Sequence, residues 1–288
     1  MLNLITVVFK DELPLLEIQA NSISQYVNSS DINSITVVVN DVDNVADLIN
    51  LSWWKQYQSR VQVIPYSKWN YTCRINGWEN QQLLKLLAAS ESTTKWSMVL
   101  DAKTWFVKPL DTSALFDLQG RSNSGLVPIF HGFEESQHFV ENYYGISMKQ
   151  VVGPGGVPFI FHTETVKGLV NSVEDFIDFF QTSCRYPHLV TEFHLYSGYI
   201  LSQYNKYDEL YSEFCAYSPV NIAHWQTDDF DNLIRSMQNP ETLTVSIHRK
   251  AYQHLTPDQI TYWVEFLKEK HLITNKKETH DAINTYIK

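Results

Sequence analysis

The sequence predicts an α/β fold with a mixed, mainly parallel central sheet flanked by helices. Over the first hundred residues, short apolar runs rich in β-branched residues alternate with longer segments of helical periodicity. One strand and the helix after it take roughly 30 residues, as in a βαβ unit, whose crossover brings the next strand parallel to the first. With 288 residues, 44% of them hydrophobic, the chain can bury a full core.

The first half supplies these elements in order. Apolar runs predict buried strands at 4–9, 35–39, 61–64 and 97–100. Helical periodicity predicts helices at 13–27, 45–57 and 77–89. Ligands bind beyond the carboxyl ends of parallel strands, so the polar residues that follow these strands are candidate site residues. They are Lys10, Asp11, Asn40, Asp41 and Asp101, although polar residues are also a normal way to leave a buried strand.

The second half is less regular. Strands are expected at 125–130, 157–161 and 243–247, and helices at 166–182 and 192–203. A further helix starts at Thr256, where Pro257 and Gln259 complete a capping-box pattern. The Gly-Pro-Gly-Gly segment at 153–156 predicts a loop that can approach a ligand closely, because glycine has no Cβ.

Composition excludes several classes of protein. The net charge of −10 argues against binding nucleic acid through a broad basic face. Three cysteines with no CxxC spacing argue against a disulfide framework and a Cys-rich zinc site. No apolar run is long enough for a transmembrane helix, and the first residues lack the basic region of a signal peptide, so we expect a cytoplasmic protein. The 8 Trp, 16 Tyr and 15 Phe exceed what is usual and suit stacking on sugars or bases.

The sharpest local feature is the segment GWENQQLLK at 77–85. On a helix, Trp78, Gln81, Gln82 and Lys85 share one face and the leucines lie towards the other. This face either lies in water or lines the cleft at the strand ends; a tryptophan there favours the cleft. Asp101 ends a strand and could bind Mg²⁺ or Mn²⁺. His248 ends another, and the Arg249-Lys250 pair after it could bind a diphosphate or lie in water.

Several motifs carry a family resemblance. They are FKDE after the first strand, VVVND, the GWxxQQxxK helix, LDAKT at 100–104 and TEFxLY at 191–196. In this order they resemble nucleotide-sugar-dependent glycosyltransferases of the GT-A fold, closest to a poorly characterised group in bacteria and their viruses. The resemblance covers about residues 4–250. It implies a nucleotide-binding half over 1–110, an acceptor half over 111–250, and a C-terminal helical extension over 251–288 packed on the same domain.

The resemblance implies a donor site for a nucleoside-diphosphate sugar, with a UDP-sugar expected. The residues that would line it are Phe9, Lys10, Asp11, Asn40, Asp41, Arg74, Trp78, Gln81, Lys85, Asp101, Lys103, Arg249 and Lys250. It also implies a Mn²⁺ or Mg²⁺ site at Asp101 and His248. Here, however, Lys103 replaces the second aspartate of the family's Asp-x-Asp motif. Either Asp101 and His248 hold a weakened metal site, or Lys103, Arg249 and Lys250 stabilise the diphosphate without metal.

The resemblance further implies a hexosyltransferase that acts on a glycan or another hydroxyl acceptor. Glu192, in the first turn of its helix, would be the general base of an inverting reaction. Gly155, Gly156, His194 and Tyr196 would lie beside the transferred sugar and the acceptor. Glutamate in a first turn is also ordinary helix chemistry. The alternative function is a non-catalytic carbohydrate-binding or assembly protein on a degenerate GT-A scaffold, which the lost second aspartate and the many aromatics would suit.

Overall fold

A five-stranded sheet forms the centre of the computed structural model, which describes residues 1–41, 43–222 and 230–273 together with residues 275, 279, 283 and 286. Its strand order is β3-β2-β1-β4-β8. The four parallel strands are β1 (Leu2–Val8), β2 (Ile32–Val39), β3 (Val61–Pro65) and β4 (Trp96–Asp101). The last strand, β8 (Phe159–His162), is antiparallel to β4. The predicted mixed, mainly parallel sheet is confirmed.

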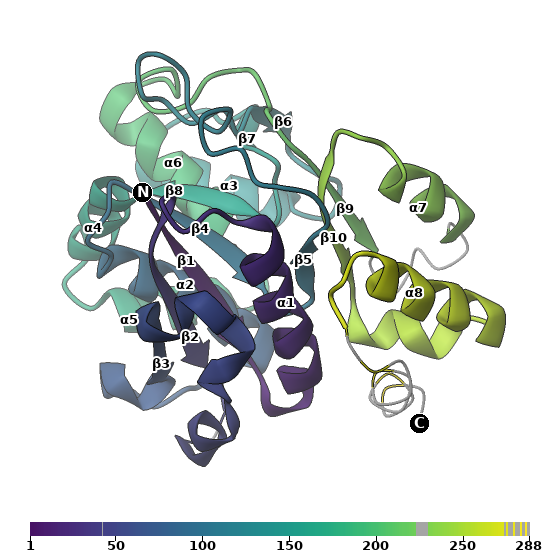
Figure 1. Cartoon of the computed structure of the whole chain (residues 1–288). Coiled ribbons are helices and arrows are strands. Elements are labelled where there is room, and N and C mark those ends of the chain that lie inside the picture. Colours follow the sequence, from purple (N-terminus) through teal and green to yellow (C-terminus); the bar gives the residue numbers. More distant parts are fainter. Residues whose placement is uncertain are drawn as a thin grey trace.

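Helices surround this sheet because its strands are apolar on both faces. Figure 1 shows their arrangement. The helix α2 (Gly77–Ser90) packs on β1 and contacts α4 (Thr163–Asn171), α5 (Phe176–Ser183) and α6 (Glu192–Tyr204). The helix α3 (Glu134–Tyr144) packs on α6. The helix α1 (Leu13–Tyr26) packs on a 3-10 segment, Leu51–Arg60.

The described residues also form two smaller sheets. In one, β10 (Thr242–Ile247) lies between β5 (Thr104–Phe106), to which it is antiparallel, and β9 (Ser218–Ile222), to which it is parallel. The other pairs β6 (Leu126–Pro128) with β7 (Gln150–Val152). The register of the first sheet sets Thr104 opposite Ser246. The end of β4 and the end of β10 therefore meet, although they are far apart in sequence.

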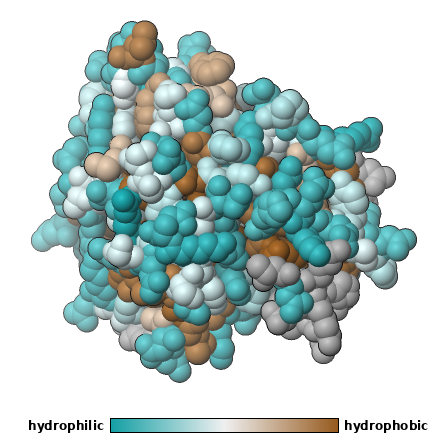
Figure 2. Space-filling model, viewed as in Figure 1, coloured by the Kyte–Doolittle hydropathy of each residue, from teal (hydrophilic) through white to brown (hydrophobic). Residues whose placement is uncertain are grey.

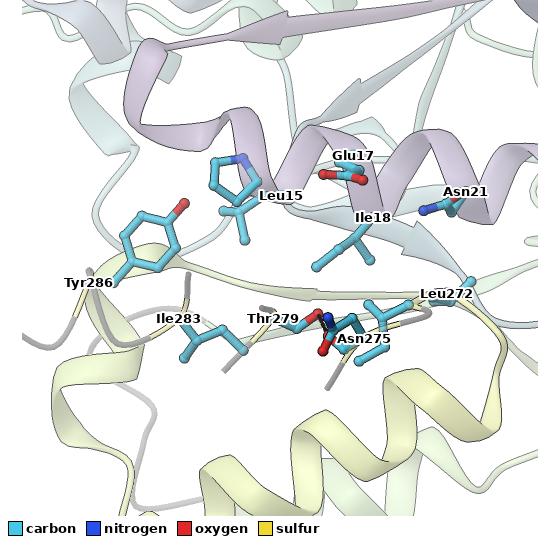
Figure 3. A pocket seen from close by; sticks show the side chains of 11 residues that line it. Leu15, Glu17, Ile18, Asn21, Leu272, Asn275, Thr279, Ile283 and Tyr286 are labelled. Atoms are coloured by element: carbon cyan, nitrogen blue, oxygen red, sulfur yellow. Dashed lines mark hydrogen bonds between the residues drawn. The ribbon is translucent and has the colours of Figure 1, made fainter. Parts of the chain in front are cut away.

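The C-terminal part of the chain builds a second, smaller apolar core. The helices α7 (Phe230–Met237) and α8 (Pro257–Glu269) pack there with Trp105 and with Leu15 and Ile18 of α1. Figure 3 shows Leu15 and Ile18 facing Leu272 and Ile283 across a cavity of about 90 Å³. Described residues near the C-terminal end, among them Leu272 and Ile283, thus pack on α1, and the expected division into two halves and an extension over 251–288 stays a prediction.

Several elements differ from the expectation. The helix expected at 45–57 is two 3-10 segments, Asp43–Leu48 and Leu51–Arg60, and Lys55 interrupts the second with a φ of 46°. The helix expected at 166–182 is the pair α4 and α5. The sequence pattern missed the helices α3 and α7 and the short strands β5, β7 and β9. Further 3-10 turns cover Lys10–Glu12, Tyr66–Trp69 and Arg249–His254.

The surface is mostly polar in the view of Figure 2, where apolar residues form small separate groups. Within the described part of the chain, no helix has both the length and the apolar character needed to cross a membrane.

Candidate active site

A cavity of about 740 Å³ opens beyond the carboxyl ends of β1, β4 and β10. This volume falls within the roughly 300–1,000 Å³ typical of ligand clefts. The polar face of α2, the end of β4 and the turn after β10 meet at this cavity. Its described lining residues are Phe9, Glu12, Gly77, Trp78, Gln81, Gln82, Lys85, Asp101, Lys103, Phe133, Gly156, Val157, Asn221, Ser246, His248, Arg249 and Lys250.

A smaller cavity of about 160 Å³ adjoins the first. The two share a wall formed by Trp78, Gln82, Lys85, Asp101, Phe133, Gly156 and Val157. The smaller one adds the start of α6 with Glu192 and His194, and the loop residue Gly155. The two cavities therefore lie next to each other on either side of this wall.

The start of α2 is fixed by local hydrogen bonds. Asn76 caps the helix and exchanges hydrogen bonds with Glu79 in a capping box. Asn40 donates to the Gly77 carbonyl at 2.9 Å. A side chain at position 77 would come within 2.8 Å of the Phe9 ring, so glycine is needed for this close approach. These contacts set the rotation of α2, so that its polar residues face the cavity.

Hydrogen bonds from α1 fix the turn between β4 and β5. The Gln19 side chain donates to the backbone carbonyls of Asp101, at 2.6 Å, and Thr104, at 3.0 Å. Thr6 of β1 donates in turn to Gln19 at 2.7 Å. The two-residue turn that carries Lys103 is therefore fixed relative to the main sheet.

Lys85 and Asp101 of the shared wall form an ion cluster with two further side chains, Glu192 of the smaller cavity and Lys103 of the larger one. Lys85 Nζ lies 2.9 Å from Asp101 Oδ1 and 3.2 Å from Glu192 Oε1. Lys103 Nζ lies 2.7 Å from Asp101 Oδ2. Gln81 donates to Asp101 Oδ1 at 2.8 Å. Both oxygens of the Asp101 carboxylate thus accept from charged or polar donors.

The cluster shifts the protonation of its members. Burial alone would raise the pKa of Asp101, but Lys103 and Lys85 outweigh it and hold that pKa well below the ordinary value. Burial works to lower the pKa of Lys85, yet Asp101 and Glu192 raise it above its usual range. For Glu192 burial dominates, and it raises the pKa although Lys85 acts in the opposite direction. Asp101 is therefore held as an anion, whereas burial disfavours the ionised form of Glu192.

Gln82 presents a buried donor that lacks a protein partner within the described residues. Its Oε1 accepts from the backbone N–H of Glu192 at 3.3 Å, which fixes the orientation of the amide. Its Nε2 has no hydrogen-bond partner, although the residue is only 2% exposed. A buried unpaired donor is costly, and this one belongs to a residue that lines both cavities, where a bound acceptor atom would satisfy it.

The opposite wall of the larger cavity follows β10. His248 caps the 3-10 turn Arg249–His254 and accepts from the Lys250 N–H at 3.2 Å. Arg249 pairs at 3.1 Å with Asp11, a largely exposed carboxylate. Glu12, which the sequence analysis did not select, is buried in this wall, and burial raises its pKa although Lys103 acts against the shift. Its place in FKDE beside two polar residues gave no signal of burial.

Apart from the charged groups of Lys85, Asp101 and Glu192, the smaller cavity is lined by aromatic and uncharged residues. His194 Nδ1 lies 2.9 Å from Ser136 Oγ on α3, and the Phe133 ring meets the imidazole edge-on. Burial lowers the pKa of His194 to about 4, so the imidazole is neutral at physiological pH. Gly155 has a φ of +76°, and a Cβ there would lie 2.4 Å from the Phe130 ring. The glycine therefore allows its loop to pack against the Phe130 ring, which lines the same cavity.

The structure brings most of the expected site residues together, with six exceptions. Among the described lining residues of the two cavities, Lys10, Asp11, Asn40, Asp41, Arg74 and Tyr196 do not appear.

These exceptions have other contacts. The Asp41 side chain accepts from the Lys10 N–H at 3.1 Å, outside the lining. Arg74 forms an ion pair with Asp178 of α5. Tyr196 lies in the core, where its hydroxyl is 2.6 Å from that of Tyr211. Strand-end position alone did not separate residues that fix the fold from residues that face the cavity.

The donor set around Asp101 does not fit a divalent cation. Mn²⁺ and Mg²⁺ require several oxygen or nitrogen lone pairs and gain from nearby negative charge. Here one carboxylate is shared by two ammonium groups. Within residues 1–41, 43–222 and 230–273, no group of three or more His, Cys, Asp or Glu residues is arranged to hold a metal.

Comparisons with known proteins agree with this architecture. A family model described as "Family of unknown function (DUF6492)" matches residues 2–269. A solved structure of the galactosyltransferase LgtC with donor and acceptor sugar analogs is 10% identical, with a TM-score of 0.50, over 98% of this chain and 100% of that one. The bifunctional glycosyltransferase WbbM is 11% identical, with a TM-score of 0.53, over 98% of this chain and 51% of that one. The search of curated proteins found no match. The chain therefore has a GT-A-like glycosyltransferase fold.

Proposed function

Since this chain belongs to the family of unknown function DUF6492, we propose its activity from the site: it transfers a sugar from a nucleoside-diphosphate sugar to a hydroxyl acceptor. The observation that carries this proposal is the pair of adjoining cavities at the strand ends. The larger is lined by cations, and the smaller by a buried carboxylate with aromatic side chains. The GT-A-like fold supports the same class of reaction.

The larger cavity suits the donor. Its volume and its position beyond the carboxyl ends of β1 and β4 fit a nucleotide, as in other open α/β sheets. Lys103, Arg249 and Lys250 would face the diphosphate, and Trp78 and Phe9 offer rings for the base or the sugar. We keep a UDP-sugar as the expected donor and a hexose as the expected sugar.

The shared wall suits the transferred sugar. The Gln82 Nε2 donor points to an acceptor atom at the junction of the two cavities. A sugar hydroxyl or ring oxygen there would satisfy this buried amide. Gly156 has open space where its Cβ would be, so the backbone leaves room beside the sugar.

The smaller cavity suits the acceptor, with Glu192 as general base. The carboxylate would take the proton of the acceptor hydroxyl while the acceptor oxygen bonds to the anomeric carbon. The bond from that carbon to the diphosphate oxygen breaks, and its electron pair leaves with the diphosphate, whose charge the cations offset. A single displacement of this kind inverts the anomeric configuration. The raised pKa of Glu192 matches a group that must accept and release a proton.

Incubation with a panel of nucleoside-diphosphate sugars tests the proposal. Saturation-transfer NMR reports binding, and the release of nucleoside diphosphate reports transfer or slow hydrolysis. We expect one donor to bind and to release its diphosphate. Glu192→Gln should keep donor binding and lose release, while Glu164→Gln, an exposed change on α4, should leave both unchanged. Failure of every donor to bind would contradict the proposal.

The alternative is a carbohydrate-binding protein without catalysis on the same fold. Asp101 bound to two lysines, where a metal motif would be expected, favours it. This alternative predicts that glycans bind near Trp78, Phe130 and Phe133, and that no donor releases nucleoside diphosphate under any metal condition.

A further inference from the structure

We propose that this site binds the donor diphosphate directly through ammonium and guanidinium groups, with no divalent ion between protein and phosphate. In this arrangement Asp101 is the counter-ion of Lys85 and Lys103, not a metal ligand. The inference rests on the proposed nucleoside-diphosphate donor and specifies how the protein recognises it.

The first observation is that both oxygens of the Asp101 carboxylate already accept hydrogen bonds from protein side chains. Oδ1 accepts from Lys85 and Gln81 at 2.9 and 2.8 Å, and Oδ2 accepts from Lys103 at 2.7 Å. A metal ion at this carboxylate would have to displace these donors and would lie next to two ammonium groups. The repulsion from two positive charges exceeds the attraction of one carboxylate at similar distances. The Asp101 carboxylate is therefore better suited to pairing with the two lysines than to binding a metal ion.

The second observation is the net positive charge of the side chains that line the larger cavity. The described lining of the larger cavity contains four cationic side chains, Lys85, Lys103, Arg249 and Lys250, against two carboxyl groups, Glu12 and Asp101. The chain as a whole has a net charge of −10. A locally cationic cavity in an acidic protein selects an anion, and field focusing within a cleft strengthens that selection.

The third observation is that the cations come from two walls. Lys103 is held on the turn between β4 and β5, which the Gln19 hydrogen bonds fix. Arg249 and Lys250 begin the 3-10 turn after β10. The pairing of Thr104 with Ser246 places these two walls next to each other. A diphosphate between them would contact a lysine on one side, with a guanidinium and a second lysine on the other.

A single substitution separates this arrangement from a metal site. Lys103→Asp recreates an Asp-x-Asp pair, so it should exchange a phosphate-binding cation for a second metal ligand. Lys103→Met is the matched control, because it removes the cation without adding a carboxylate. The Lys103 side chain is 18% exposed, and both replacements can be checked for folding by circular dichroism and thermal unfolding.

The measurement is calorimetric binding of UDP, GDP, ADP, CDP and inorganic pyrophosphate, each in EDTA and in Mn²⁺. We expect wild-type affinity in EDTA to stay within about twofold of that in Mn²⁺. Lys103→Asp and Lys103→Met should each lose roughly tenfold or more in EDTA, the lower range for a hydrogen bond to a charged group. Mn²⁺ should restore binding to Lys103→Asp alone, and electron paramagnetic resonance should detect Mn²⁺ bound to that variant and not to the wild type.

Two outcomes would overturn the inference in different ways. Wild-type binding of UDP that requires Mn²⁺ would contradict the metal-independent site and leave the donor proposal standing. Absence of UDP, GDP, ADP and CDP binding in both conditions would overturn the donor proposal, and with it this inference.

Discussion

Replacing Lys85 with methionine tests the ion cluster on which the site is built. Lys85 is 5% exposed and lies between Asp101 and Glu192. With Lys103 included, the four groups carry no net charge when both carboxyls are ionised. Lys85→Met leaves one net negative charge in a buried position. Removing one partner of a buried ion pair costs about 3–5 kcal/mol, so we expect a loss of this size in the free energy of unfolding.

The penalty should depend on pH. Without Lys85, the pKa of Glu192 should rise further, because the nearby opposite charge of Lys85 lowers that pKa in the wild type. A carboxyl whose pKa is raised in the folded state is disfavoured as an anion there. The destabilisation should therefore be small in acid and grow as pH rises through the pKa of Glu192 in the folded protein.

Urea unfolding followed by tryptophan fluorescence at several pH values measures this effect. The double variant Lys85→Met/Glu192→Gln removes both charges, so it should be more stable than Lys85→Met plus Glu192→Gln would predict, by about 0.5–3 kcal/mol. Lys167→Met breaks an exposed pair with Glu164 and should cost less than ~1 kcal/mol. A Lys85→Met protein as stable as wild type, or strictly additive variants, would refute the buried cluster.

Three further predictions concern single groups of the site. Glu192→Gln should lower kcat by about 100-fold or more with little change in donor binding, which initial rates and calorimetry measure. The acid limb of the wild-type pH–rate profile should lie above the ordinary glutamate pKa of 4.5. Gln82→Met should weaken sugar-nucleotide binding by roughly 2- to 10-fold and leave free UDP binding unchanged, since one neutral hydrogen bond is lost. Gly155→Ala should lower stability by about 1–3 kcal/mol in thermal or urea unfolding because of its positive φ and the Phe130 ring, whereas Gly156→Ala, with open space, should not.

The sheet was predictable because its strands are nearly continuous apolar runs. Leu2–Val8 is buried at every position, and such a run has few alternatives in an α/β sequence. The helix α3 escaped notice because its pattern depends on contacts that only the fold supplies. Its Ser136 and Val140 are buried against α6, Tyr144 meets Tyr199 of α6, and Phe139 and Tyr143 contact Phe179 of α5.

Part of the site was predictable from the helical periodicity of its residues. Polar residues at 81, 82 and 85 share a helix face, and the structure buries all three at the strand ends. The polar face of this helix thus faces the cavity and not water. Asn40 shows the limit of the same reasoning. It follows a strand as expected, but it bonds to Gly77 and Asn80 and fixes α2 instead of lining the cavity.

Contacts between distant segments could not be predicted from spacing. The approach of Lys103 to the turn after β10 depends on the register of β5 with β10, and β5 was too short to detect. The pairing of Lys85 with Glu192 likewise depends on how α2 and α6 pack together. Such relations come from tertiary structure, where local sequence patterns give no signal.

A crystal structure with bound UDP tests the central claim most directly. The account predicts the diphosphate in the larger cavity, with its oxygens within hydrogen-bond distance of Lys103 and of Arg249 or Lys250. UDP seated elsewhere on the protein, or a cavity that stays empty at a UDP concentration that saturates binding in solution, would contradict it.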